Sequence, residues 1–82
     1  MEKYSVIFGK DAENGEIIAF FPESRSSGKI LCYAHIGQHC EASMSYYWTT
    51  KKASPEEYAG LLAELRGIYE HGEDAMQLVV KQ

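Results

Sequence analysis

The chain has 82 residues, of which 45% are hydrophobic and 24% charged, and twelve acidic against eight basic residues give a net charge of −4. This length admits one domain with one core, and the composition is that of a globular rather than a disordered protein. The acidic balance disfavours binding to a nucleic-acid backbone, because such binding relies on Lys and Arg to neutralise phosphates.

Two features of the sequence bear on the cellular setting of the protein. The chain has two cysteines, and it contains no apolar run long enough to span a membrane. Its first residues pass directly into an alternating strand pattern, without the apolar stretch of a secretion signal. We therefore expect a cytoplasmic protein with reduced thiols and no membrane contact.

The first part of the sequence has the pattern of a β-hairpin. Large apolar side chains recur at every second position of residues 3–9, which is the period of a β-strand. Asn14 and Gly15 follow, and this pair supplies the positive φ of a tight turn. A second strand is predicted over Glu16–Phe21. Pro22 is expected to end this strand, because proline has no N–H for the ladder.

A third strand is predicted over Ile30–Ile36, after a polar loop at residues 22–29. Side chains alternate between the two faces of a strand. Cys32 is expected on the face beneath the long helix that follows in the chain, because its small side chain permits close approach, and Tyr33 on the opposite face. Gly37 is expected to break the strand and to begin a turn over residues 37–42.

Residues 43–50 fit two different structures. Ser43 is suited to cap a short helix over Met44–Thr49. The β-branched and aromatic residues of this segment also allow an extended conformation. We predict the helix, with Tyr47 and Trp48 on the side that covers apolar surface.

A second helix has a clear start in the sequence. Ser54 and Glu57 have the spacing of a capping box, and Pro55 occupies the first helical position, where its missing N–H costs nothing. His71 and Gly72 are expected to end the helix. The helix is predicted to be long, amphipathic and packed on the sheet through Tyr58, Leu61, Leu62, Leu65, Ile68 and Tyr69.

The last element predicted is a strand over Met76–Lys81. The chain is therefore expected to form one α+β domain over residues 1–82. Its predicted order is a three-stranded antiparallel meander, a short helix, a long helix packed on the sheet, and a C-terminal fourth strand. The pattern leaves open whether the fourth strand lies beside the first or the third.

Residues 32–40 hold both cysteines and two of the three histidines. Thiolate and imidazole are zinc ligands, but Cys32 and His35 point to opposite faces of a strand, and the tight ligand pairs of zinc sites are missing. His39 and Cys40 are sequence neighbours, which seldom have the mutual orientation of a base and a nucleophile. We therefore assign no metal, no cofactor and no catalytic residue, and keep a small-ligand or metal site at 32–40 as an alternative function. The candidate binding residues are Tyr33, His35, Gln38, His39 and Cys40.

Both faces of the predicted strands carry apolar side chains, whereas one long helix can cover only one face. Either the segment 43–50 or a second chain must cover the other. Tyrosine and tryptophan are also common anchors of protein interfaces. The leading function is therefore an interaction module that binds a protein partner or itself, as a homodimer. The predicted interface residues are Ile18, Phe20, Leu31, Tyr33 and Trp48.

A third function, the binding of single-stranded nucleic acid, follows from aromatic residues with basic neighbours. Such ligands bind to stacked aromatic rings beside a basic groove. The net charge opposes this function, and the same aromatics serve equally well as the core of a small domain. Nucleic-acid binding is therefore ranked last. The residues concerned are Tyr33, Tyr46, Tyr47, Trp48, Lys51 and Lys52.

Three runs of the sequence, taken together, resemble a group of small, uncharacterised bacterial proteins. The runs are Phe20–Glu23 (FFPE), Cys32–His39 (CYAHIGQH) and Ser54–Glu70 (SPEEYAGLLAELRGIYE). With the terminal VVK, the resemblance covers most of the chain. It implies an accessory cytoplasmic role, but it carries no known activity and transfers no functional residue.

Overall fold

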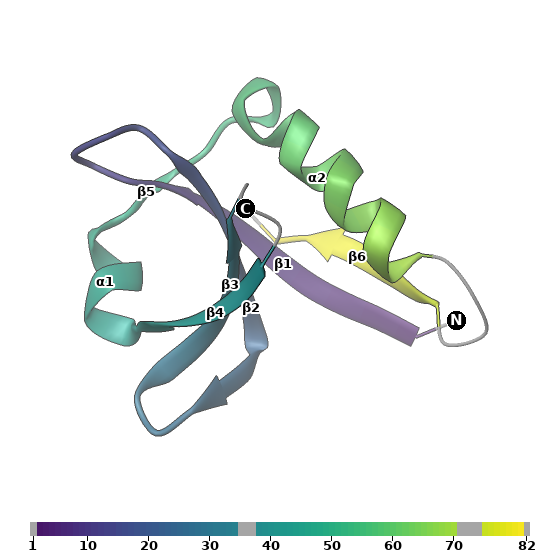
Figure 1. The fold of residues 1–82 in the computed structure, drawn as a ribbon, viewed down its shortest axis with the longest axis horizontal. Helices are drawn as coiled ribbons and strands as arrows, with labels where there is room; N and C mark the ends of the chain where they lie inside the picture. Colours follow the sequence, from purple (N-terminus) through teal and green to yellow (C-terminus); the bar gives the residue numbers. More distant parts are fainter. Residues whose placement is uncertain (1, 35–37, 71–74, 82) are drawn as a thin grey trace.

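The computed structural model describes residues 2–34, 38–70 and 75–81, which form an α+β fold (Figure 1). These described residues contain six strands and two helices. In chain order the elements are β1 (Glu2–Lys10), β2 (Ile17–Ser26), β3 (Lys29–Ala34), β4 (Gln38–Ser43), α1 (Met44–Thr49), β5 (Lys51–Lys52), α2 (Pro55–Tyr69) and β6 (Met76–Val80).

The strands form one strongly curled sheet in the order β4-β3-β2-β1-β5 (Figure 1). Each neighbouring pair in this order is antiparallel, so the predicted three-stranded meander is extended by β4 and β5. β6 is parallel to β1, with Tyr4 opposite Leu78. The strand predicted last in the sequence therefore lies beside the first strand and not beside the third.

The turn between β1 and β2 has the local chemistry predicted for it. Gly15 has a φ of 73°, a conformation that glycine adopts without steric cost. The carboxylate of Asp11 accepts hydrogen bonds from the amides of Glu13 and Asn14, at 2.8 and 3.0 Å. Asp11 thus holds the turn through its own side chain.

The prediction that Pro22 ends the second strand is wrong, and so is the predicted loop at residues 22–29. β2 continues to Ser26, with a register shift between Phe21 and Arg25. Such an irregularity tolerates proline, because it leaves residues outside the regular ladder. The hairpin then turns at Ser27 and Gly28, which both have positive φ.

The turn predicted over residues 37–42 is also wrong where the structure describes it, because residues 38–43 form β4. This strand pairs with β3, with Tyr33 opposite His39 and Ile30 opposite Ala42. His39 and Glu41 are exposed, whereas Ala42 packs against buried side chains. Polar residues suit a strand at the edge of a sheet, where one side of the backbone meets solvent.

Helix α2 covers one face of the sheet and begins with the predicted capping box. The Ser54 hydroxyl accepts from the Glu57 amide, and the Glu57 carboxylate accepts from the Ser54 amide. A hydrogen bond from Lys10 lowers the pKa of Glu57 to about 2. Ile68 is 48% exposed, so the apolar stripe is narrower than predicted. The buried residues of this α2 core are Tyr4, Val6, Phe8, Ala19, Phe21, Tyr33, Ala53, Leu61, Leu65 and Leu78.

Helix α1 covers the opposite face and has the predicted bounds and the predicted N-cap, Ser43. Beneath it lies an α1 core in which Phe20 and Cys32 are buried. The expectation that Cys32 lies beneath the long helix is therefore wrong. Because Tyr33 is the cross-strand partner of Ala19, it shares a face with Ala19 on the α2 side instead. The buried members of the α1 core are Ile18, Phe20, Ile30 and Cys32, and its half-buried members are Ala42, Met44, Tyr46 and Tyr47.

Candidate functional site

Two of the five predicted binding residues, Tyr33 and His39, lie in contact. They are cross-strand partners on β3 and β4, and their ring centroids are 4.9 Å apart with an edge-on geometry. Tyr33 is 2% exposed, whereas His39 is exposed. The His39 Nε2 atom lies 2.5 Å from the Tyr69 hydroxyl of α2. The pair thus joins the edge strand to the helix.

The hydroxyl of Tyr33 meets an acid of the same helix. A hydrogen bond to Glu64, together with burial, raises the pKa of Tyr33. Burial also raises the pKa of Tyr69. Tyrosine is already protonated at neutral pH, and these upward shifts move its deprotonation still further from neutrality. Both side chains therefore act as hydrogen-bonding groups of the fold.

The other three predicted binding residues cannot be placed in this cluster. His35 lies outside the described residues, as do the helix-ending residues His71 and Gly72. Gln38 and Cys40 are placed by their backbone in β4, and their side chains lie outside the description. Within the described part of the chain, no group of three or more His, Cys, Asp or Glu side chains has the arrangement of a metal site.

The predicted interface residues separate into buried and exposed members. Ile18 and Phe20 lie in the core beneath α1, and Tyr33 lies in the core beneath α2. Leu31 is half-buried against the α2 core. Only Trp48 is open to solvent, with 73% of its surface exposed. Trp48 therefore does not cover apolar surface, although it was expected on the covering side of the segment 43–50.

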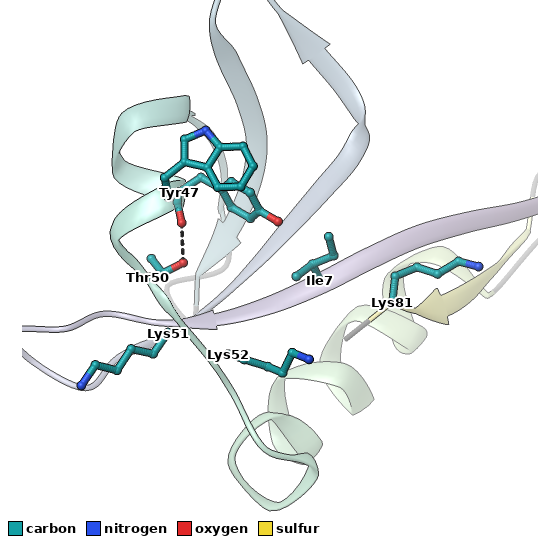
Figure 2. Close-up of a pocket in the computed structure, with 7 residues that line it drawn as sticks. Ile7, Tyr47, Thr50, Lys51, Lys52 and Lys81 are labelled. Atoms are coloured by element: carbon teal, nitrogen blue, oxygen red, sulfur yellow. Dashed lines mark hydrogen bonds between the residues drawn. The ribbon is translucent and has the colours of Figure 1, made fainter.

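A cavity of about 270 Å³ adjoins Trp48 on the α1 side of the sheet (Figure 2). The sequence reasoning missed Lys81 and the connecting residue Thr50, and it left Ile7, an apolar residue of the second strand face, out of the predicted site. The other lining residues belong to the aromatic run and the two lysines that follow it, which the sequence had already indicated as a possible binding surface. We call the lining residues the Trp48 surface, and they are Ile7, Tyr47, Trp48, Thr50, Lys51, Lys52 and Lys81.

The cavity lies where two short strands leave a gap along the edge of β1. β5 pairs with Gly9 and Lys10, whereas β6 pairs with residues 2–6. Ile7 lies between these two paired stretches, and its side chain stands between Tyr47 and Lys81 in Figure 2. The gap exists because the chain leaves β1 after β5, forms α2, and returns as β6 (Figure 1).

Helix α1 is fastened to the sheet by the two tyrosines that precede Trp48. The Tyr47 ring meets Phe20 edge-on at 4.9 Å between centroids. The Tyr46 hydroxyl donates to the carboxylate of Asp11 at 2.5 Å. Burial raises the pKa of Tyr46 to about 12, and the bond to Asp11 acts in the same direction. Trp48 is thus presented outward by a helix that is anchored from below.

Gly9 positions the connection between α1 and β5. A Cβ atom at this residue would lie 2.7 Å from the Thr50 hydroxyl oxygen and 2.9 Å from a ring carbon of Phe20. Thr50 also donates its hydroxyl proton to the Tyr47 carbonyl oxygen at 2.7 Å. The missing side chain of Gly9 therefore allows Thr50 to close against β1, which places β5 beside the cavity.

Lysines dominate the charge of the Trp48 surface. Lys52 lies opposite Gly9, and Lys81 is held by a hydrogen bond from its amide to the Val6 carbonyl oxygen at 2.9 Å. Lys51 extends away from Lys52 in Figure 2. All three are exposed, and none of the acidic residues that the structure describes lines the cavity. The site therefore combines aromatic and aliphatic surface with positive charge.

Comparison with known proteins gives no match to this chain among protein-family models, curated proteins or solved structures. Within the described ranges, neither helix has the length and apolar character needed to span a bilayer. The geometry of the Trp48 surface is therefore the main basis for assigning a function.

Proposed function

We propose that the chain is a small protein-interaction module that binds a partner protein through the Trp48 surface. The observation that carries this proposal is the 73% exposure of Trp48 beside a cavity. Tryptophan is among the residues most enriched at the energetic centres of protein interfaces. Its exposure leaves an apolar surface that a partner can cover with a gain in free energy.

The size and anchoring of the site support a peptide-like partner. A cavity of about 270 Å³ is slightly smaller than the roughly 300–1,000 Å³ of pockets that enclose drug-sized ligands. It suits one side chain inserted from another protein. Because Tyr46 and Tyr47 fasten α1 to the sheet, binding requires little further ordering of the site, which reduces its entropic cost.

Two other functions have less support from the described residues. A small-ligand or metal site at 32–40 is disfavoured because Tyr33 is buried and His39 is bonded to Tyr69. The aromatic platform for single-stranded nucleic acid is dispersed, because Tyr33 lies on the α2 side and Tyr46 is bonded to Asp11. A cytoplasmic accessory role in a bacterium fits the proposal, and a second copy of the chain is the alternative occupant of the Trp48 surface.

The proposal is tested by selection of a random peptide library displayed on phage against the intact protein. We expect enriched peptides whose affinity falls about 30-fold or more in Trp48→Ala, the effect of losing an interface anchor worth about 2 kcal/mol. Ile68→Ala is the matched control, because it removes the other large exposed apolar side chain of the described residues. The Ile68→Ala variant should bind the same peptides with unchanged affinity.

Light scattering after size exclusion accompanies the selection and distinguishes a partner from self-association. A concentration-dependent dimer that Trp48→Ala abolishes would make the occupant a second copy of the chain. Peptides that bind Trp48→Ala as tightly as the natural sequence would contradict the proposed site, as would the absence of any enrichment.

A further inference from the structure

The positive charge of the Trp48 surface is not neutralised within the described residues. Two ion pairs occur there, Lys10 with Glu57 at 2.6 Å and Arg66 with Glu70 at 3.7 Å. Neither involves a lysine of the Trp48 surface. Three of the eight basic residues thus gather at one cavity of a protein with a net charge of −4.

The positions of Lys52 and Lys81 along β1 define a spacing. Lys52 is opposite Gly9, whereas Lys81 follows Val80, the partner of Val6, and so lies level with Ile7. Two residues of a strand span about 7 Å. This distance equals the separation of alternate residues in an extended chain, whose side chains point to the same face. Two carboxylates at alternate positions therefore match the two lysines.

We propose that the Trp48 surface selects an acidic segment of its partner, in which carboxylates at alternate positions face Lys52 and Lys81 while an apolar side chain enters the cavity beside Trp48. This inference rests on the proposed function and names the class of partner. Its basis is charge complementarity, because opposite potentials across an interface favour encounter and exclude partners of like charge.

A nucleic acid is a weaker match to the same lysines. Its affinity grows with the number of phosphates neutralised, and a strand would extend beyond the cavity over a protein of net negative charge. Stacking along a strand also needs successive exposed rings, whereas Trp48 is the only aromatic residue among the large exposed apolar side chains described. A short acidic segment meets the positive charge without these costs.

Fluorescein-labelled peptides test the inference with the full chain. Three of the peptides contain one phenylalanine in a serine background and differ at the alternate positions on both sides of it, which are glutamate, serine or lysine. A fourth peptide is the glutamate peptide with alanine in place of phenylalanine. Binding is followed by anisotropy and by the emission of Trp48, the only tryptophan. We expect the acidic phenylalanine peptide to bind about 10-fold more tightly than the serine peptide at low salt, with the advantage shrinking at high salt.

The double variant Lys52→Glu/Lys81→Glu should lose this advantage. The matched control is Lys3→Glu/Lys29→Glu, which changes the net charge equally at exposed lysines outside the cavity. This control variant should retain at least half of the affinity advantage of the acidic peptide over the serine peptide. Circular dichroism verifies that both variants are folded.

The outcomes separate the two proposals. Equal, Trp48-dependent binding of the acidic and serine peptides would overturn the acidic partner class and leave the proposed function standing. Failure of every phenylalanine peptide to alter Trp48 emission would also overturn the acidic partner class, whereas the proposed function is overturned only if the phage selection yields no Trp48-dependent peptide. Tighter, Trp48-dependent binding of an oligothymidylate than of the acidic peptide would identify the surface as a nucleic-acid site and contradict the inference.

Discussion

Replacing Phe20 by alanine is expected to lower the free energy of unfolding by about 3–5 kcal/mol, the usual cost of removing a buried phenylalanine. Phe20 is fully buried between β2 and helix α1. Its ring contacts Tyr46 and Tyr47, with centroid distances of 6.4 and 4.9 Å. The substitution therefore removes the apolar surface on which α1 is seated, as well as a large volume of core.

Chemical denaturation followed by circular dichroism measures this loss. Trp48→Ala is the matched control, because it removes an aromatic side chain of α1 that is exposed. We expect the control to change the free energy of unfolding by no more than about 0.5 kcal/mol, as for most surface substitutions. A loss for Trp48→Ala as large as that expected for Phe20→Ala would contradict the exposure of Trp48, and little or no loss for Phe20→Ala would contradict the burial of Phe20 beneath α1.

Leu65→Ala is expected to cost about 2–5 kcal/mol of the free energy of unfolding. Leu65 is fully buried in the α2 core, where it belongs to the same cluster as Phe8 and Leu78. Truncation leaves a cavity between the helix and the sheet, which the rigid strand backbones can fill only in part. Because β1 and β6 both contribute to this core, the whole domain should unfold at lower denaturant in one transition.

Ile68→Ala controls for the change of helix propensity in the same element. Ile68 is 48% exposed on α2, and alanine has the higher helix propensity, so this variant should be neutral or slightly more stable. Equal denaturation midpoints for Leu65→Ala and Ile68→Ala would remove Leu65 from the core. They would also require a different face of α2 to contact the sheet.

The features predicted from the sequence with correct detail are those determined by neighbouring residues. Ser54 and Glu57 cap the helix that they precede, and Ser43 caps α1, because these hydrogen bonds join residues three apart. Gly15 likewise adopts its positive φ within a local turn. Such signals depend on backbone geometry that the sequence itself specifies.

Features that depend on pairing between distant segments were missed. β2 continues past Pro22 because β3 pairs with its far end beyond the register shift. β4 consists largely of residues with little strand propensity of their own, and β5 has only two residues. Each is a strand because a neighbouring strand supplies its hydrogen-bond partners, and no local pattern reports that neighbour.

The candidate site in the structure differs from the predicted one for the same reason. Strand alternation correctly placed Cys32 and Tyr33 on opposite faces, but it could not decide which face lies under which helix, because that depends on register with β2. Lys81 joins Trp48 only through the parallel pairing of β6 with β1. The site is assembled from segments far apart in the chain, and the sequence could indicate only its aromatic and basic half.

Collisional quenching of Trp48 fluorescence tests the central claim most directly, because the chain has a single tryptophan. Iodide and caesium are compared at matched low ionic strength. An exposed indole beside Lys52 and Lys81 should be quenched more strongly by iodide than by caesium, although the protein has a net charge of −4. The difference should shrink as salt screens the lysines. Stronger quenching by caesium, or emission that neither ion quenches, would contradict an open, positively charged Trp48 surface.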